Sequence, residues 1–243
     1  MESERECKSM SEGPNPSVTR LNVLLAEAGL EPLDAAQTGR FEDYLSLLLR
    51  WNTRVNLTAI RDEEGILTRH FVESIACARA LPTGIATLLD FGSGAGFPGI
   101  PIALCRPEIA VTLAESQGKK AAFLREALRV LRVAAKVHSG RAEALESQFD
   151  CVTLRAVDRM PRAVEAAARL VRPGGWLALM TTGKELDALK AAAEAEFVWA
   201  GVVHLPGGEE RVVALGMRGG GFVSELPSTP GTSHNCGLRS GGD

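Results

Sequence analysis

The residues with the clearest chemical meaning follow an apolar segment near the middle of the chain. Asp90 ends this segment, and Gly92, Gly94 and Gly96 come soon after it. Glycines let the backbone pass close to a bound molecule, because they carry no Cβ. Two prolines follow, as is tolerated in a first helical turn, and the start of a helix offers unpaired N–H groups. We therefore predict a strand, a glycine-rich turn and a short helix over 100–105, which together form the floor of a nucleotide-type cofactor site.

Two classes of cofactor compete for this turn. Residues 94–99 match the G-x-G-x-x-G fingerprint of dinucleotide-binding proteins, which would make the chain a nicotinamide-dependent oxidoreductase. In that fingerprint the first glycine stands at the end of the strand, whereas here Asp90 and Gly92 come earlier. The order D-x-G-x-G-x-G is instead typical of enzymes that use S-adenosylmethionine. Binding of labelled S-adenosylmethionine but not NAD would separate the two classes.

Further candidates stand where the next predicted strands end. Glu115 ends the second strand, where a carboxylate accepts hydrogen bonds from both ribose hydroxyls of an adenosine-containing cofactor. Arg141, Ala142 and Glu143 follow the third strand, where a chain segment flanks an adenine ring, although an ordinary helix start explains them equally well. Arg155 closes the fourth strand, and an arginine there is costly to bury unless it meets a carboxylate, a phosphate or a ring face. We expect Arg155 to point into the ligand crevice, with a structural ion pair as the alternative.

Strands and helices alternate after residue 86, which predicts a mainly parallel sheet with helices on both faces. Two strands joined by Pro-Gly-Gly at 206–208 finish the pattern, so the last strand must run antiparallel to its predecessor. This ending favours an α/β fold of the class I (Rossmann-like) methyltransferase type, a mostly parallel seven-stranded sheet with a terminal antiparallel hairpin, over an all-parallel dinucleotide-binding sheet. After the first strand, the predicted strands are 109–115, 135–139, 149–155, 174–181, 197–205 and 211–217, and the predicted helices are 118–131, 159–171 and 184–196.

An N-terminal helical extension precedes the sheet. Helices are predicted over 18–29 and 34–52, and a third begins after Asp62 as its N-cap and ends before Pro82. The C-terminal tail is rich in Gly, Ser, Thr and Pro, and it has too few large apolar residues to offset its ordering entropy. The predicted parts of the chain are a disordered tail (1–16), a helical region (17–83), a cofactor-binding core (84–218) and a second disordered tail (219–243).

The net charge of −3 excludes a chain that binds nucleic acid through an overall basic character. Contact with RNA would need a local patch, and arginines are concentrated in the helical region. The candidates for RNA binding are Arg50, Arg54, Arg61, Arg69 and His70. Arginines on solvated helix faces are the alternative, and a lone histidine on the flank of a helix is more often structural than catalytic.

The remaining composition bears on location and on metals. The five cysteines form no C-x-x-C pair, which indicates reduced thiols in a cytosol and no structural zinc. No apolar run reaches the length of a membrane span, and residues 1–16 lack the apolar core of a secretory signal. We expect a cytoplasmic protein without a metal and without a membrane partner.

Several linked motifs resemble those of a known family and occur in its order and spacing between residues 45 and 217. The motifs are Trp51-Asn52 with Asn56-Leu57-Thr58, Arg69-His70-Phe71 with Ser74-Ile75, the segment from Asp90 to Pro101, Lys119-Lys120 with Phe123-Leu124, Arg141-Ala142-Glu143, and Arg155-Ala156. Through them the chain resembles the bacterial 16S ribosomal RNA (guanine-N7) methyltransferases, known as RsmG or GidB. The Gly-Phe-Pro-Gly-Ile-Pro sequence at 96–101 is far more specific than the glycines alone.

The resemblance implies a methyltransferase that moves a methyl group from S-adenosylmethionine to N7 of one guanine near the ribosomal decoding site. Its partner would be 16S rRNA or the small ribosomal subunit, and we expect a monomer. The family's cofactor contacts carry over to Gly92, Phe97, Ala142, Glu143 and Arg155, and Arg155 is the expected catalytic residue. The remaining members of the predicted cofactor set are Asp90, Gly94, Gly96 and Glu115.

Two alternatives stay open beside the oxidoreductase: an RNA-binding assembly factor without catalysis, and a methyltransferase of the same fold that acts on a small molecule or another substrate. The intact set of cofactor residues speaks against the first, and the arginine-rich helical region speaks against the second. The chain departs from the family after the strand segment Trp176–Met180, where many members have Lys-Gly and this chain continues with Thr181-Thr182-Gly183-Lys184. The resemblance therefore assigns no functional lysine to the part of the site that follows this strand.

Overall fold

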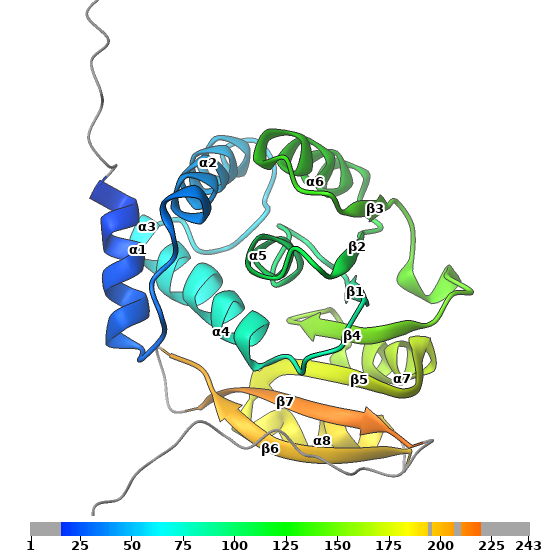
Figure 1. The fold of residues 1–243 in the computed structure, drawn as a ribbon. Helices are drawn as coiled ribbons and strands as arrows, with labels where there is room; N and C mark the ends of the chain where they lie inside the picture. Colours follow the sequence, from blue (N-terminus) through cyan, green and yellow to red (C-terminus); the bar gives the residue numbers. More distant parts are fainter. Residues whose placement is uncertain (1–15, 194–195, 207–209, 220–243) are drawn as a thin grey trace, which may run out of the picture.

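Seven strands form one sheet at the centre of the structure, a computed structural model that describes residues 16–193, 196–206 and 210–219 (Figure 1). Their order across the sheet is β3-β2-β1-β4-β5-β7-β6. β7 runs antiparallel to β5 and β6, and all other neighbours are parallel, which confirms the predicted sheet with its terminal hairpin. The strands are β1 (Thr87–Phe91), β2 (Ala110–Ala114), β3 (Lys136–His138), β4 (Phe149–Arg155), β5 (Val171–Thr182), β6 (Phe197–His204) and β7 (Arg211–Arg218).

Helices cover both faces of the sheet (Figure 1). Successive side chains of a strand point to opposite faces, and accordingly Leu88 and Leu89 of β1 lie in different buried clusters. Helices α4, α5 and α6 cover the face of Leu88, and α7 and α8 cover the face of Leu89. The helices are α1 (Pro16–Glu27), α2 (Ala35–Asn52), α3 (Glu63–Ile66), η1 (Leu67–Val72), α4 (Glu73–Ala80), α5 (Gly99–Cys105), α6 (Gly118–Leu131), η2 (Ala142–Ala144), α7 (Met160–Leu170) and α8 (Gly183–Ala192).

Some predictions fall outside the described residues. The predicted tails, 1–16 and 219–243, do so except for Pro16 and Gly219. The same holds for 194–195 near the end of the predicted helix 184–196, and for 207–208 in the predicted turn. Within the described ranges, no helix is long and apolar enough to cross a membrane.

The third predicted helix is continuous, but its winding changes in the middle. Asp62 caps its start, as expected, by accepting a hydrogen bond of 2.6 Å from the backbone N–H of Gly65. Between α3 and α4 the chain forms a π-helical segment, η1. Such segments are rare and are frequently found at functional sites. This one carries Arg69 and His70, for which the apolar periodicity predicts an ordinary helix.

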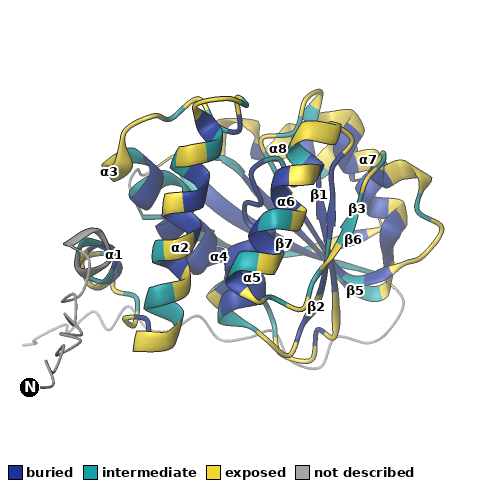
Figure 2. Ribbon diagram, turned by 90° about the horizontal axis from the view of Figure 1, so that it is seen from above, coloured by how far each residue is buried: buried dark blue, intermediate teal, exposed yellow. Residues whose placement is uncertain are grey.

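The N-terminal helices share one core with the sheet. A single buried cluster contains Phe41 and Tyr44 of α2, Phe71 of η1, Phe97 of the turn before α5, and Ile100 in the first turn of α5. Figure 2 shows α2 exposed on its outer side and buried on the side that faces α4. The helical region therefore positions the glycine-rich turn by direct packing, and the boundary after residue 83 stays a prediction.

Asp150 near the start of β4 holds together the edge of the sheet where the parallel strands begin. Its Oδ2 accepts hydrogen bonds from the backbone N–H groups of Ala86 and Thr87, at 2.9 and 2.7 Å. Its Oδ1 pairs with Arg172. Burial by itself raises the pKa of Asp150, but the hydrogen bonds outweigh burial and lower the pKa to about 2.

Asp150→Asn is expected to lower the free energy of unfolding by about 2 kcal/mol at pH 7, because the pKa of the carboxyl falls from 3.8 to about 2 on folding. This stabilisation is fully present above pH 3.8 and is lost as the pH falls through 2. Urea unfolding at pH 7 and pH 3 measures it, with the exposed Asp187→Asn as control. A loss of the same size at both pH values would contradict its ionic origin.

Candidate functional site

The glycine-rich turn lies between β1 and α5, at the edge where the parallel strands end. Gly94 and Gly96 have positive φ angles of 57° and 94°, which residues with a side chain rarely adopt. A Cβ on Gly96 would lie 2.5 Å from Cδ1 of Ile100, whereas a Cβ on Gly94 would meet nothing nearer than 3.9 Å. Gly96 is therefore required by packing inside the molecule, and Gly94 leaves open space in which a ligand can approach the backbone.

Asp90, near the end of β1, braces this turn from inside. Its Oδ1 accepts a hydrogen bond of 3.0 Å from Oγ1 of Thr153, and its Oδ2 accepts one of 3.2 Å from the backbone N–H of Gly99. Burial raises the pKa of this carboxyl to about 6, although its hydrogen bonds act in the opposite direction. Asp90 thus ties the turn to β4 and to the start of α5, and a direct contact with a cofactor stays a prediction.

Glu115 follows β2 and lies against the same turn. Its Oε2 accepts a hydrogen bond of 2.9 Å from the backbone N–H of Gly94, and its Oε1 accepts one of 2.7 Å from that of Gln117. A carboxylate offers about four lone-pair sites, so each oxygen keeps the capacity to accept from a second donor. Because β1 and β2 are neighbours, this carboxylate stands beside the open space at Gly94.

The segment after β3 extends the site along the same edge. Ala142 begins η2 and is buried, whereas Glu143 is exposed and lies 3.9 Å from Arg141. β3 is hydrogen-bonded to β2, and the backbone N–H of Glu115 donates to the carbonyl of His138 at the end of β3. The turn, Glu115 and η2 therefore follow one another along the sheet edge, and an adenine contact of Ala142 and Glu143 stays a prediction.

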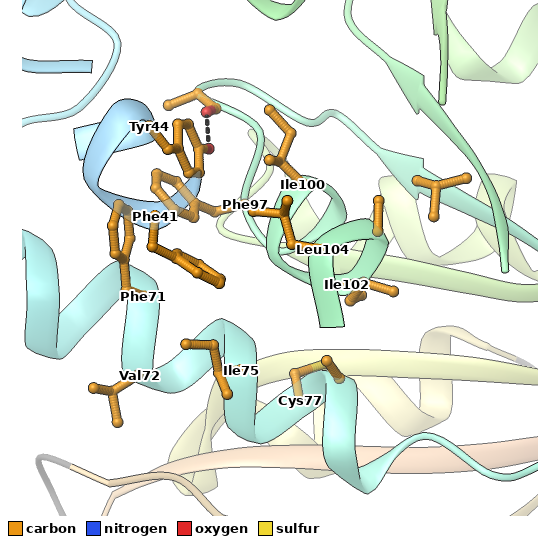
Figure 3. Close-up of a cluster of buried hydrophobic side chains, with 14 of the residues drawn as sticks. Phe41, Tyr44, Phe71, Val72, Ile75, Cys77, Phe97, Ile100, Ile102 and Leu104 are labelled. Carbon is orange, nitrogen blue, oxygen red and sulfur yellow. Dashed lines mark hydrogen bonds between the residues drawn. The ribbon is translucent and has the colours of Figure 1, made fainter. Parts of the chain in front are cut away.

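Phe97 of the turn packs into an aromatic cluster with residues of α2 and η1 (Figure 3). Its ring stacks on that of His70, with 4.7 Å between centroids, and on that of Tyr44, with 5.2 Å. The hydroxyl of Tyr44 donates a hydrogen bond of 2.6 Å to the carbonyl of Ala95 (Figure 3). The cluster thus holds the turn in place, and a contact between Phe97 and a cofactor stays a prediction.

His70 is a neutral ring within this cluster. Its Nδ1 lies 3.1 Å from Nη2 of Arg155, and its Nε2 lies 2.7 Å from Oγ1 of Thr58. A guanidinium only donates, so Nδ1 accepts and Nε2 carries the proton that it donates to Thr58. Burial, and after it the charges of the neighbouring arginines, lower the pKa of His70 to about 3. His70 therefore brings no positive charge to an RNA phosphate near neutral pH.

Arg155 at the end of β4 turns towards the helical region. Its Nη2 lies 3.0 Å from Oε2 of Glu73 and also donates to the carbonyl of Arg69. Its Nη1 donates to Oγ of Ser74 at 3.3 Å, and the side chain is only 7% exposed. The sequence predicts that Arg155 points into the ligand crevice, whereas the structure shows the alternative, a structural ion pair with Glu73. A direct catalytic contact of Arg155 stays a prediction.

Sequence reasoning missed two members of this network, Glu73 and Arg211. Glu73 is fully buried on α4, and its carboxylate meets Nε of Arg69 at 3.2 Å and Nε of Arg211 at 2.6 Å. Strand alternation could have indicated Arg211, because it falls on the same face of β7 as the buried Val213 and Leu215. A charged side chain on that face needs an opposite charge from the helices that cover it.

A family comparison decides what kind of protein this site belongs to. The model of the family described as "rRNA small subunit methyltransferase G" (GidB) matches residues 37–211. The chain belongs to this family. The predicted family and the predicted rRNA methyltransferase are thereby confirmed.

Individual relatives agree with this assignment. The Ribosomal RNA small subunit methyltransferase G of Xanthomonas campestris pv. campestris (strain B100) is 44% identical over 170 residues, which cover 69% of this chain and 77% of that protein. The protein of the same name from Roseiflexus sp. (strain RS-1) is 47% identical over 150 residues, which cover 59% of this chain and 64% of that protein.

Solved structures share the fold at low sequence identity. A methyltransferase from Pyrococcus furiosus has a TM-score of 0.55 at 15% identity, over 75% of this chain and 99% of that chain. An O-methyltransferase from Bacillus cereus in complex with SAH has a TM-score of 0.54 at 17% identity, over 82% of this chain and 97% of that chain. The likeness concerns the fold alone, and it confirms the predicted class I methyltransferase architecture.

The other arginines predicted to bind RNA lie on the surface of the methyltransferase G fold, on the helical region. Arg50 is exposed and lies 3.3 Å from a carboxylate oxygen of Glu126, and Arg54 is exposed as well. Arg61 is exposed and donates to Oδ1 of Asn56 at 3.3 Å. Their contact with rRNA stays a prediction. In the described part of the chain, no group of three or more His, Cys, Asp or Glu side chains could hold a metal ion.

Gly99→Ala is expected to destabilise the protein by about 1 to 3 kcal/mol, because an extra methyl group overpacks a filled core. The new Cβ would lie 2.3 Å from Cδ2 of Leu113 and 2.6 Å from Oδ2 of Asp90. Gly39→Ala in α2 is the matched control: nothing lies within 4 Å of its Cβ, and we expect a gain of about 0.5 to 1 kcal/mol from helix propensity. Thermal unfolding compares the two variants, and equal midpoints would contradict the tight packing at the start of α5.

Proposed function

We propose that this protein transfers a methyl group from S-adenosylmethionine to N7 of one guanine of 16S rRNA, close to the decoding site. Membership in the rRNA small subunit methyltransferase G family carries the proposal, and the geometry of the site is compatible with it. The substrate is 16S rRNA, free or in the small ribosomal subunit, and the enzyme works as a monomer in the cytoplasm. The only evidence for a nicotinamide-dependent oxidoreductase is the G-x-G-x-x-G match, and the family to which the chain belongs is one of methyltransferases.

The residues along the sheet edge fit S-adenosylmethionine. Gly94 leaves room beside the backbone of the turn, and Glu115 keeps lone pairs free for two ribose hydroxyls. Ala142 and Glu143 follow β3, where they would flank the adenine. When bound, the cofactor supplies a methyl group attached to a positively charged sulfur. Asp90 keeps the turn in place from the side of the protein.

No general base is required for this reaction. N7 of guanine already carries an in-plane lone pair, so no proton has to be removed before N7 attacks the methyl group. His70, whose ring stacks on Phe97 of the turn, is not available as a base, because both its ring nitrogens are engaged by Arg155 and Thr58 and its pKa is about 3. The protein then acts by holding N7 in line with the methyl group. The purine gains positive charge as it is methylated, which nearby carboxylates and carbonyls stabilise.

Transfer of a labelled methyl group tests the proposal. The protein is incubated with labelled S-adenosylmethionine and with small ribosomal subunits, deproteinised 16S rRNA or an unrelated RNA of similar length. After digestion to nucleosides we expect the label in 7-methylguanosine from one or both of the first two substrates and none from the third. Label in a different nucleoside, or no transfer to any RNA despite binding of the cofactor, would contradict the proposal.

A further inference from the structure

One buried carboxylate lies at the edge of the sheet where the parallel strands end, and it faces three arginines from three different elements. Glu73 of α4 is 0% exposed, and it lies 3.2 Å from Arg69 of η1 and 3.0 Å from Arg155 of β4. Arg211 of β7 contacts it with two nitrogens, Nε at 2.6 Å from Oε1 and Nη2 at 2.8 Å from Oε2. We name these four residues the arginine cluster.

The arginine cluster has two more positive than negative charges. Among the described residues, no second carboxylate lies within ion-pair distance of these arginines, and Glu210, the neighbour of Arg211 in sequence, pairs with Lys184 at 2.7 Å. Besides burial, all three arginines lower the pKa of His70, so their field reaches the aromatic cluster. Partly buried charge without a partner is costly, whereas an anion from outside the protein would neutralise it.

Two of the three arginines have donors available for such an anion. Arg155 is 7% exposed and its terminal nitrogens are engaged, whereas the side chains of Arg69 and Arg211 are 43% and 24% exposed. Within the described ranges, the terminal nitrogens of Arg69 and Nη1 of Arg211 have no hydrogen-bond acceptor. Guanidinium groups match the oxygens of phosphate with two parallel hydrogen bonds.

The place of Arg211 in the sheet favours the substrate as the source of the anion. The residues that fit the cofactor follow β1, β2 and β3, whereas β7 lies on the far side of β4 and β5 (Figure 1). Arg211 pairs with Thr182 at the end of β5, and Arg155 pairs with Met180 of the same strand. Arg211 therefore stands at the same edge as the cofactor residues but away from them.

We propose that Arg69 and Arg211 bind a backbone phosphate of the RNA substrate, and that Glu73 holds their guanidinium groups in position for it. This inference rests on the proposed function and adds to it the contact that positions the RNA chain beside the reacting guanine. Phosphate contacts fix the register of a nucleic acid and carry no information about the base. Both arginines therefore act on the affinity for RNA and its salt dependence.

Equilibrium binding of 16S rRNA between 50 and 200 mM KCl tests this site. We expect Arg211→Gln to weaken binding about 10-fold at the lowest salt and to reduce the slope of log K against log [KCl] by about 1, because one phosphate contact is lost. Arg211→Lys keeps the charge and should keep the slope. Arg218→Gln is the matched control, since Arg218 is 20% exposed and pairs with Glu196 at 2.8 Å at the other end of β7. The affinity for S-adenosylmethionine should change less than twofold in every variant.

Three results would overturn the phosphate site. The first is an unchanged slope of log K against log [KCl] in Arg211→Gln, and the second is an equal loss of RNA affinity in Arg218→Gln. The third is a loss of affinity for S-adenosylmethionine in Arg211→Gln while its binding of RNA is unchanged. The last result would assign the anion to the carboxylate of the cofactor. If Arg211→Gln fails to fold by circular dichroism, Arg69→Gln provides the same test at the most exposed member of the cluster. The binding assay contains no methyl donor, so it tests the phosphate contact independently of catalysis. If the unsubstituted protein methylated no RNA, that result would contradict the proposed function but not the phosphate contact.

Discussion

Glu73→Gln is expected to lower the free energy of unfolding by about 3 to 5 kcal/mol, as is usual when one partner of a buried ion pair is removed. The substitution leaves Arg69, Arg155 and Arg211 facing one another around a neutral amide. Glutamine has a single oxygen that accepts hydrogen bonds, so it cannot replace both carboxylate oxygens that now pair with the arginines. Urea unfolding at pH 7 measures the loss. Methyl transfer should fall as well, because the cluster joins η1, β4 and β7 at the edge that carries the site.

Glu64→Gln is the matched control for this prediction. Glu64 also bonds an arginine, at 2.7 Å from Nη2 of Arg20, but the two side chains are 55% and 41% exposed and water screens the pair. We expect no measurable change in stability. The double variant Glu73→Gln with Arg211→Gln should lose less than the sum of the single losses, because removing Arg211 relieves repulsion among the remaining charges. Additive losses would contradict an electrostatic origin.

Glu115→Ala is expected to weaken the binding of S-adenosylmethionine by at least about 100-fold, because in the proposed site it removes two charge-assisted hydrogen bonds to ribose hydroxyls, each worth about 1.5 to 3 kcal/mol. It also removes the acceptor for the backbone N–H of Gly94, so the glycine-rich turn loses one of its fixed points. Isothermal titration calorimetry measures the dissociation constant. Saturating cofactor should restore most of the rate, because the role proposed for Glu115 is in binding the cofactor.

Two variants give this prediction its controls. Glu146→Gln changes the net charge at an exposed position beyond η2 and should leave the affinity unchanged. Glu115→Gln keeps the length of the side chain, but its amide nitrogen cannot accept a hydrogen bond, so an intermediate loss is expected. If Glu115→Ala bound the cofactor as tightly as the unsubstituted protein, the ribose would have to be held elsewhere.

The sheet could be predicted from the sequence because each strand and helix has its own apolar pattern. The two closing strands and the turn between them were enough to predict an antiparallel end, and β7 confirms it. The π-helical segment η1 could not be predicted in this way. It changes the winding over six residues inside a continuous helix, and Ile66, Phe71 and Ile75 remain buried along it. The apolar pattern alone therefore gave no sign of how Arg69 and His70 are presented.

Arg155 shows why the candidate site was only partly predictable. Its position at the end of β4 was clear, and alternation along β4 puts it on the same face as the buried Cys151 and Thr153. Its partner Glu73 stands 82 residues earlier in the chain, and no local pattern links the two. A buried charge is stabilised by whichever opposite charge the tertiary structure brings to it. That pairing became visible only once the helical region had been placed on the sheet.

Mapping the methylated nucleotide shows whether the protein modifies N7 of a single guanine in 16S rRNA. Small ribosomal subunits are treated with the protein and S-adenosylmethionine, and the RNA is then cleaved at 7-methylguanosine by borohydride and aniline and read by primer extension. We expect one new cleavage site in 16S rRNA near the decoding site, which requires the cofactor and is nearly absent with Glu115→Ala at limiting cofactor. Cleavage at many unrelated guanines, or none although the cofactor binds, would contradict the assignment of this protein as a guanine-N7 methyltransferase.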